Sequence, residues 1–307
     1  MDSIFGPIIF RPIGWFFNLL FDICGGHVAP AILLLTLTIN VLLFPLSVRQ
    51  QKSTAKQTAI KPQLERLKEK CGDDRVKYQQ EMQELYQKEG VSMTGGCLTS
   101  FIRLPFLWAI WAVIRNPFTY MAGAYNPTIR EAAATAVKSL GDKAGQYAEL
   151  QLINNPEALE KFGLGGIFPE GSFSLFGLDL TVCPTVKDPS IDWLFPLLAF
   201  ATAMLSSVVM MRQNKRNMTA DEYKQQQTMG CMMYGMPLIT LVFSFSGIPA
   251  AISFYWAFSN VLSMFIQMIV TRKFGPYVAI SQNFAKIIKK QKEFEKTRML
   301  RRLDSEN

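Results

Sequence analysis

The chain has 307 residues, of which 49% are hydrophobic and 18% charged, and its formal net charge is +8. One or two soluble domains would be usual at this length, but this composition is biased toward membrane proteins. The positions of the charges favour a membrane protein too, because residues 28–48, 193–211 and 225–270 contain no Asp, Glu, Lys or Arg.

Residues 1–27 are rich in aromatic side chains but are interrupted by Pro7 and Pro12 and carry Arg11 and Asp22. This pattern predicts a helix that lies at the outer membrane interface rather than one that spans the bilayer. The segment has neither a basic start nor a small-residue cleavage site, so we do not expect a cleavable signal peptide.

Five stretches are long enough to cross a bilayer, which needs about 20 apolar residues. The last uncharged run is too long for one span and is divided at Gly247-Ile248-Pro249. The sequence therefore predicts an all-α, polytopic membrane protein with five transmembrane helices, at 28–48, 97–119, 193–211, 229–246 and 249–271.

The basic residues predict the orientation of these helices. Residues 49–90 hold ten Lys and Arg, the connector 212–224 four and the tail from Arg272 ten, whereas residues 116–191 hold five against eight Asp and Glu. By the positive-inside rule, 49–96, the connector 212–228 and the basic tail 272–307 are cytoplasmic, and the N-terminus and 120–192 are extracytoplasmic. The basic residues on the predicted cytoplasmic side could serve only to orient the spans. Alternatively, they could also bind anionic lipids, ribosomal RNA or an acidic protein.

Two of the predicted connecting regions have some helical character of their own. Residues 49–96 contain two amphipathic helices separated by Cys71-Gly72-Asp73-Asp74, which predicts a cytoplasmic helical hairpin. In the extracytoplasmic region, 127–162 is Ala-rich and weakly helical, and a Gly- and Pro-rich loop follows it.

No motif indicates enzymatic chemistry. The five cysteines are scattered, His27 is the only histidine, and there is no phosphate-binding glycine loop and no nucleophile beside a base. We therefore expect no cofactor, no metal site and no catalytic residues.

Three stretches resemble one known family. GVSMTGGCLTSFIRLPF (90–106), GLDLTVCPTVKDPSIDWLFPLL (177–198) and MMYGMPLITLVFSFSGIPAAISFYWAFSNVLSMFIQ (232–267) fall in the order typical of the YidC/Oxa/Alb family of membrane protein insertases. The resemblance covers about residues 10–275, while 122–165 looks like an insertion whose role the sequence leaves open.

The resemblance implies a bacterial cell membrane protein whose five spans enclose a polar groove, open to the cytoplasm and to lipid. A nascent hydrophobic segment would lodge in this groove and then move into the bilayer. Nascent membrane proteins are the implied clients, and the basic tail resembles ribosome-contacting tails. The identity of the clients, the oligomeric state, and action alone or with the Sec translocon and the signal recognition machinery all stay open.

Polar residues in the predicted spans could line such a groove, because polar groups at membrane depth are tolerated where they meet water or each other. Hydrogen bonding within or between helices is the alternative for each of them. The candidates are Arg103, Asn40, Thr36, Thr99, Ser100, Ser206, Asn260 and Gln267.

The sequence departs from the family at the first span. The resemblance implies an arginine a few residues before the Pro-Leu that ends this span, but TLTINVLLFPLS has Asn40 there. Arg103 lies at a similar depth in the second span, so we expect it to supply the positive charge of the groove, with Asn40 as a neutral neighbour. The alternative is that Arg103 extends to the cytoplasmic surface as a topology anchor.

Arg115 should have a different role from Arg103. Twelve helical residues separate the two, which places them about 120° apart around the helix. Arg115 shares a face with two tryptophans near the outer end, which predicts a ring-stacked interface anchor. The predicted anchors are Arg115, Trp108, Trp111, Tyr255 and Trp256.

Two other functions compete with insertion. A small-solute transporter or channel would also place polar residues in its spans, but the chain shows no internal duplication. A non-inserting assembly factor would hold partner helices without a working groove.

Overall fold

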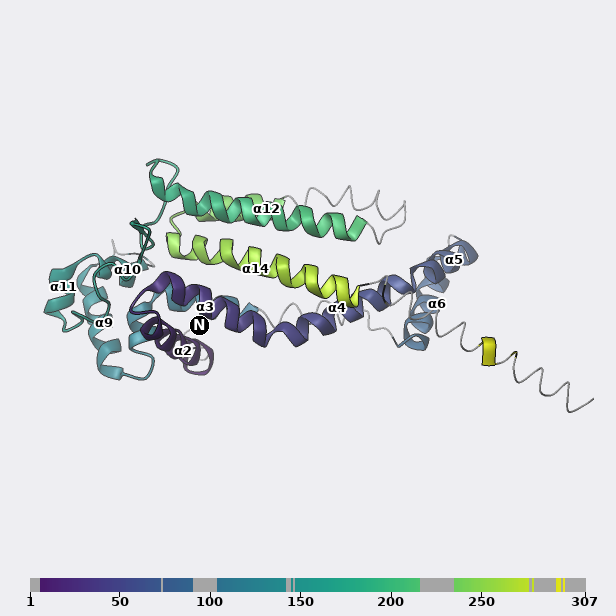
Figure 1. The fold of residues 1–307 in the computed structure, drawn as a ribbon, viewed down its shortest axis with the longest axis horizontal. Coiled ribbons are helices and arrows are strands. Elements are labelled where there is room, and N and C mark those ends of the chain that lie inside the picture. The colour runs from purple at the N-terminus through teal and green to yellow at the C-terminus, as the bar shows by residue number, and fades with distance from the viewer. Residues whose placement is uncertain are drawn as a thin grey trace, which may run out of the picture. The chain divides into compact units, whose positions relative to one another are not determined.

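The computed structural model describes residues 6–72, 74–90, 104–141, 145, 147–215, 235–275, 278, 291–293 and 295. These residues are mostly helical, with a single pair of short strands among them (Figure 1). The chain divides into two compact units, one formed by Met1–Leu43 and Phe101–Phe265 and the other by Phe44–Ser100 and Ile266–Asn307.

Two helices in the described part of the chain are long and apolar enough to cross a membrane. They are α12 (Leu194–Lys215) and α14 (Ala250–Phe274), and a third span results if α3 (Val28–Leu42) and α4 (Phe44–Ala59) count as one. Two shorter apolar helices, α8 (Leu104–Arg115) and Gly235–Ser244, lie in the predicted spans 97–119 and 229–246, both of which begin outside the described residues. The helical membrane architecture is confirmed, and the count of five spans stays a prediction.

Helix α3 ends at Leu42, six residues before the predicted end of the first span, and α4 begins at Phe44. Pro45 explains the break, because its ring lacks an N–H donor and clashes with the carbonyl of the residue four positions earlier. The backbone N–H of Leu43 still bonds to the carbonyl of Ile39 at 2.9 Å, so α3 ends in an ordered turn.

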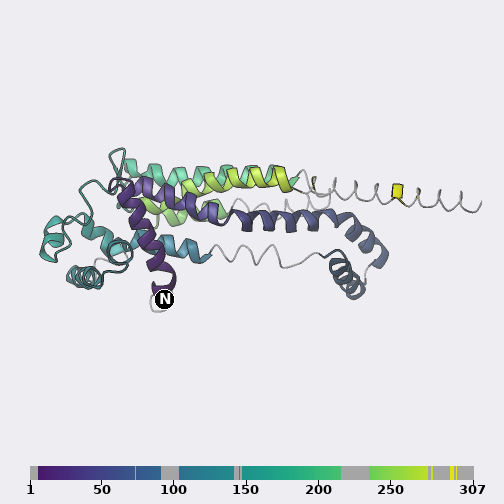
Figure 2. The ribbon, with the colours of Figure 1, turned by 60° about the horizontal axis from the view of Figure 1, so that its bottom comes forward.

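The N-terminal segment forms the turn η1 (Gly6–Phe10) and helix α2 (Arg11–Ile23). Helix α2 packs against α3, α8 and η2 (Phe118–Ala122) (Figure 2). Its Phe17 and Phe21 are buried in the core. The contact with η2 needs Gly14, since a Cβ atom there would lie 1.9 Å from the carbonyl oxygen of Tyr120. The opposite side of α2 exposes Trp15 and Leu19, which suits the predicted interfacial helix.

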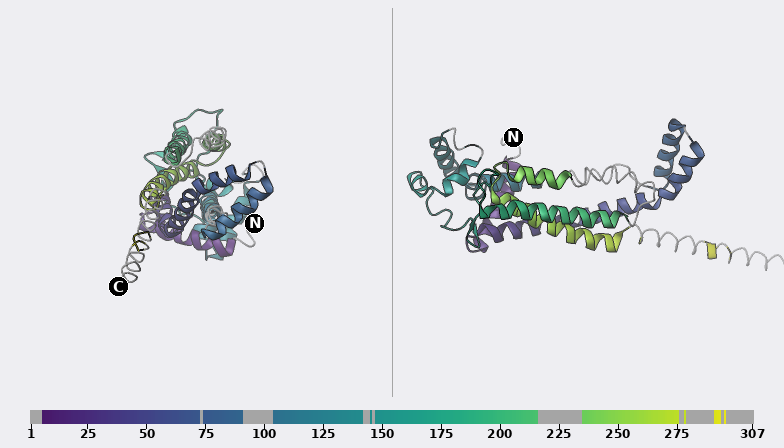
Figure 3. Two further views of the ribbon diagram at one scale, coloured as in Figure 1. Left: turned by 90° about the vertical axis from the view of Figure 1, so that its right-hand side faces the viewer. Right: turned by 90° about the horizontal axis from the view of Figure 1, so that it is seen from above.

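Within the first unit, α12 and the part of α14 up to Phe265 run alongside one another in all views (Figure 1, Figure 2, Figure 3). The rings of Phe195 and Phe254 meet edge to face, with their centroids 6.2 Å apart. Asn260 on α14 also bonds to the carbonyl oxygen of Ala199 on α12. These contacts hold the two longest apolar helices together by packing and by one interhelical amide.

The predicted extracytoplasmic region contains three helices and a small β-hairpin. The helices are α9 (Pro127–Ser139), α10 (Ala148–Ile153) and α11 (Pro156–Lys161), and the asparagines before α9 and α11 cap their first turns. Strands β1 (Ser174–Leu175) and β2 (Leu178–Asp179) pair antiparallel, with Ser174 opposite Asp179. The hairpin is a small addition to the predicted all-α fold. The sequence did not indicate it, because a two-residue strand is too short for alternation to show.

In the second unit, α4 leads into α5 (Lys61–Cys71) and α6 (Arg75–Lys88), which pack against each other. The break between them lies at the predicted position, with Gly72 at a φ of 55° and the carboxylate of Asp74 accepting the backbone N–H of Lys77. An ion pair between Lys70 and Glu81, 3.2 Å apart, joins the two helices. Their cytoplasmic location stays a prediction.

Candidate functional site

The proposed working charge of the groove, Arg103, lies outside the described residues, as do Thr99 and Ser100. The other five predicted groove residues are described, and they lie on α3, α12 and α14. The hydrogen bonds of these residues run either within one helix or from one helix to another.

On α3, both predicted groove residues bond to their own helix. The hydroxyl of Thr36 donates to the carbonyl of Ile32 at 2.7 Å, and Thr36 is only 1% exposed. The amide nitrogen of Asn40 donates to the carbonyl of Thr36 at 2.8 Å, while the residue stays half-buried. Asn40 is thus the more accessible of the two polar groups.

Asn260 lies between α12 and α14 rather than on a free face. Its amide nitrogen is 3.4 Å from the carbonyl oxygen of Ala199 and 3.5 Å from the hydroxyl oxygen of Thr202. Ser206 lies one turn farther along α12 and is half-buried. The structure therefore brings Asn260 and Thr202 together, and Thr202 was not among the residues predicted from the sequence.

Gln267 forms an amide bridge within the second unit. Its amide nitrogen donates to the side-chain oxygen of Gln51 at 3.0 Å and to the hydroxyl of Thr271 at 3.2 Å. Gln51 is only 8% exposed, which is unusual for a glutamine. The pairing was not predictable from local patterns, because 216 positions separate Gln51 from Gln267.

The predicted stacking of Arg115 is present. The guanidinium carbon lies 4.4 Å from the centre of the Trp111 ring, within the range of a cation–π contact. Trp108 on the same helix is 47% exposed, Trp256 is half-buried and Tyr255 is 8% exposed. Among the predicted anchors, Trp108 is therefore the one with the most surface available for lipid.

Arg115 also lies close to a buried carboxylate that was not predicted. Glu149 on α10 is 6% exposed and accepts hydrogen bonds from both the backbone N–H and the hydroxyl of Thr119. Burial raises the pKa of this carboxyl above its usual value, while the bonds from Thr119 and the charge of Arg115 oppose the rise. Glu149 thus joins helix α10 to η2, the turn that follows α8.

Tyr147 belongs to the same cluster. Burial and the nearby Cys183 raise the pKa of its phenol, and the charge of Arg115 opposes this. One sequence signal could have identified the cluster, because Glu149 shares a helical face with Leu152 and Ile153. An acid on an apolar face is a candidate for a buried, hydrogen-bonded group.

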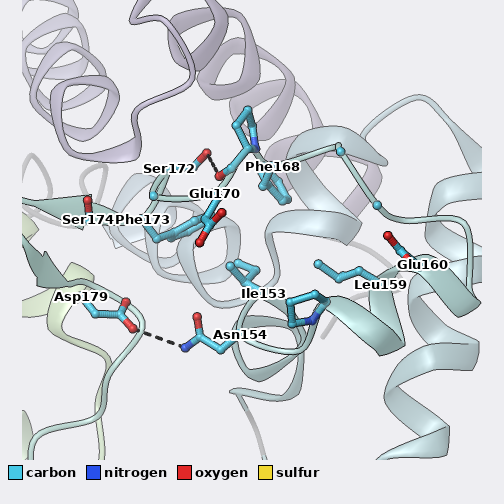
Figure 4. A pocket seen from close by; sticks show the side chains of 15 residues that line it. Ile153, Asn154, Leu159, Glu160, Phe168, Glu170, Ser172, Phe173, Ser174 and Asp179 are labelled. Carbon is cyan, nitrogen blue, oxygen red and sulfur yellow. Dashed lines mark hydrogen bonds between the residues drawn. The ribbon is translucent and has the colours of Figure 1, made fainter.

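A cavity of about 690 Å³ lies in the predicted extracytoplasmic region, between α10, α11 and the loop before β1 (Figure 4). Phe168, Phe173 and Leu159 give it an apolar wall, and Glu170 and Asp179 lie at its polar side, where Asp179 meets Asn154 (Figure 4). None of the five described groove residues, Thr36, Asn40, Ser206, Asn260 and Gln267, lines this cavity.

The family profile and the similar known proteins agree on one family. The sequence profile of the family described as "60Kd inner membrane protein" matches residues 19–276. The chain is similar to proteins named membrane protein insertase YidC, at 29% identity in Bradyrhizobium diazoefficiens, 27% in Beijerinckia indica and 29% in Caulobacter vibrioides. These alignments cover 84%, 92% and 90% of the chain, respectively.

The same alignments cover 35%, 40% and 38% of the three relatives, so the chain spans less than half of their length. The family and the apolar helices identify a bacterial inner-membrane protein that crosses the bilayer more than once. The profile match extends over most of the chain and includes all three motif stretches that carried the resemblance. The chain therefore belongs to the 60Kd inner membrane protein family, which is the YidC/Oxa family expected from its motifs.

Proposed function

We propose that this protein is a membrane protein insertase. The observation that carries the proposal is the profile match over residues 19–276, together with relatives that are named as insertases. In this role the protein would receive hydrophobic segments of nascent membrane proteins and release them into the bilayer.

The proposed site is a polar groove between the spans, open to the cytoplasm. Its lining comes from the predicted set, and Asn40 on α3 and Ser206 on α12 are half-buried members of that set. The hydrogen bonds of Asn260 and Gln267 to neighbouring side chains would hold the helices around the groove. The driving force is burial of the client's apolar segment, worth roughly 0.02 to 0.03 kcal/mol per Å².

We further propose that Arg103 supplies the positive charge that attracts an acidic flank of the client. Asn40, at the position where the family resemblance implies arginine, cannot do so. A cation at membrane depth costs roughly 2.5 to 3.5 kcal/mol on insertion scales, so a functional reason for keeping Arg103 is expected.

The test measures insertion of a single-span client with an acidic flank in cells depleted of their own insertase. Arg103→Ala should lower insertion about tenfold, which corresponds to about 1.4 kcal/mol of attraction. Arg103→Lys should retain most of the activity, and Asn40→Arg should restore it in the Arg103→Ala background. The control is Arg212→Ala, which removes an exposed arginine near the end of α12. Full insertion by Arg103→Ala would reject the proposed role of Arg103.

Purified protein in liposomes separates insertion from the two competing functions. Insertion of the client without other proteins excludes an assembly factor that has no working groove. Passage of small solutes through the liposome membrane, without client insertion, would instead indicate a transporter or channel.

The proposed partners follow from the same function. Nascent membrane proteins are the clients, and the tail 272–307 with its ten Lys and Arg is the proposed ribosome contact. Anionic lipids would bind the same basic face. The Sec translocon and the signal recognition machinery are proposed as further partners in client delivery.

A further inference from the structure

The turn between β1 and β2 has an unusual residue at its tip. Phe176 and Gly177 form this two-residue turn, with φ angles of 51° and 81°. Turns with two positive φ angles favour Asn-Gly or Asp-Gly, since most side chains are strained there. Phe176 is the one non-glycine residue with a positive φ in the part of the chain that the structure describes, and 96% of it is exposed. A strained, fully exposed phenylalanine contributes nothing to the packing of the fold.

The hairpin is attached to the first residues of two apolar helices. The backbone N–H of Val28, at the start of α3, donates to the carbonyl of Ser172 at 2.8 Å. The N–H of Ala251, at the start of α14, donates to the carbonyl of Leu180 at 2.9 Å. Figure 1 shows the two strands beside the first turns of α12 and α14, whereas α11 lies farther out.

These attachments limit the distance between the turn and the membrane. Leu180 is four positions after Phe176, so the two cannot be more than about 14 Å apart. The headgroup region is about 5 to 8 Å deep on each side of the hydrocarbon core. If α14 begins at the boundary of the core, Phe176 is within reach of the headgroups.

Exposed apolar side chains also lie where the hairpin meets the start of a membrane-spanning helix. Strand β2 contacts η4 (Ile191–Trp193), in which Ile191 is 72% exposed, and Leu194 in the first turn of α12 is 53% exposed. Trp193 donates its indole N–H to the carbonyl of Thr185 at 3.0 Å, so the polar group of this side chain is satisfied within the protein. We call Phe176, Ile191 and Leu194 the apolar band.

We propose that the apolar band lies in the headgroup region of the bilayer and that Phe176 inserts between lipids there, as an anchor for the loop that joins α8 to α12. The occupant is lipid because the band continues onto α12, whose exposed leucines need an apolar surrounding in the membrane. The sequence predicts that this leaflet is the outer one. The proposal requires the membrane position of α12 and α14 and is independent of insertase activity.

The first experiment places a tryptophan at the tip of the turn. The fluorescence of Phe176→Trp, after subtraction of the wild-type spectrum, is measured in liposomes with lipids brominated near the headgroups and with iodide on both sides. The introduced indole is expected to be quenched by the brominated lipids and shielded from iodide. The control is Glu157→Trp at an exposed position on α11, which should show the reverse. Equal access of iodide to both positions would overturn the proposal.

The second experiment keeps an aromatic ring at the site in the native membrane. A photoreactive benzoylphenylalanine at position 176 should form lipid adducts on illumination, detected by mass spectrometry, and the same residue at position 157 should not. Adducts mainly with another protein, or with a second copy of this chain, would show that the band is a protein contact and would overturn the proposal. Melting of each variant at the wild-type temperature confirms that the turn still folds.

Discussion

Thr119 and Glu149 show how one hydrogen-bonded pair can connect the segment 122–165 to the turn that follows α8. Arg115 stacks on Trp111 at the end of α8, and Glu149 reaches the same place from α10. Thr119 holds the carboxylate with two hydrogen bonds. The sequence predicted a ring-stacked interface anchor at Arg115, and the structure adds that its charge acts on the buried carboxylate of Glu149. Docking of the segment 122–165 therefore depends on a buried polar cluster as well as on apolar contacts.

The raised pKa of Glu149 predicts a specific pH dependence of stability. The folded protein holds the proton of the Glu149 carboxyl more tightly than the unfolded chain does. The stability gained in this way is fully present below the unfolded pKa of about 4.5, and it is lost as the pH rises through the pKa of the folded state. Glu149→Gln should remove this dependence. In nanodiscs at pH 8, the melting temperature of Glu149→Gln should exceed that of the wild type by about 2 to 4 °C, which corresponds to about 1 kcal/mol in the free energy of unfolding. This difference should shrink toward pH 5.

The control for this prediction is Glu157→Gln, which changes an exposed glutamate on α11 and should leave the wild-type pH dependence unchanged. Parallel curves of melting temperature against pH for the wild type and Glu149→Gln would contradict the prediction. They would mean that the carboxyl of Glu149 does not hold its proton more tightly in the folded state.

At the scale of elements, α4 and the end of α14 are held together by contacts that sequence patterns do not reveal. Gln267 bonds to Gln51, and the ammonium of Lys52 lies 4.8 Å from the centre of the Phe274 ring. Both contacts belong to the second unit. They link the helix that leads to α5 and α6 with the last residues of the final apolar helix. The amide pair is therefore a candidate for fixing the register between α4 and α14.

A double-mutant cycle tests the amide pair. Gln51→Leu and Gln267→Leu should each lower the free energy of unfolding, and the double variant should be destabilised by less than the sum. We expect a coupling energy of about 0.5 to 1.5 kcal/mol, in the range found for hydrogen bonds between membrane helices. Unfolding in mixed micelles provides the measurement. Thr54→Val is the matched control, since the Thr54 hydroxyl bonds to the carbonyl of Gln50 on its own helix. A coupling as small as that between Thr54→Val and Gln267→Leu would contradict the prediction.

At the scale of the whole molecule, the long apolar segments were predictable because charge-free runs report directly on burial in lipid. The predicted spans 193–211 and 249–271 correspond to α12 (Leu194–Lys215) and α14 (Ala250–Phe274), and both helices continue past the apolar run. The helix break near Pro45 follows from local chemistry.

Contacts between distant segments were not predictable in the same way. Glu149 bonds to Thr119, 30 positions away, and Gln51 bonds to Gln267, 216 positions away, so local periodicity identifies neither pairing. The β-hairpin was missed because its strands are too short to show alternation, and its place is fixed by bonds from Val28 and Ala251 to the flanking residues Ser172 and Leu180. For the groove, the sequence provided a set of residues, whereas the structure shows which of Thr36, Asn40, Asn260 and Gln267 bond to their own helix and which to another.

The role of the basic tail concerns the whole molecule, because its ten Lys and Arg can act in two ways. They can orient the spans by the positive-inside rule, or they can also bind ribosomal RNA. Removal of residues 276–307 should reduce co-sedimentation with ribosomes. The logarithm of the binding constant should also fall less steeply with the logarithm of salt concentration, by roughly 0.7 to 0.9 for each phosphate that the tail no longer neutralises.

Two further variants separate the two roles of the tail. A full-length tail with its Lys and Arg after position 275 changed to Gln should behave like the truncation, because charge rather than length neutralises phosphates. Arg212→Gln with Lys215→Gln reduces the basic charge of the connector, and it should leave the salt dependence of ribosome binding unchanged. Protease accessibility of the loop 120–192 in intact cells reports orientation. If truncation reduces ribosome binding and leaves the orientation normal, the tail binds RNA. If ribosome binding and its salt dependence are both unchanged, the charges of the tail serve only as a topology signal.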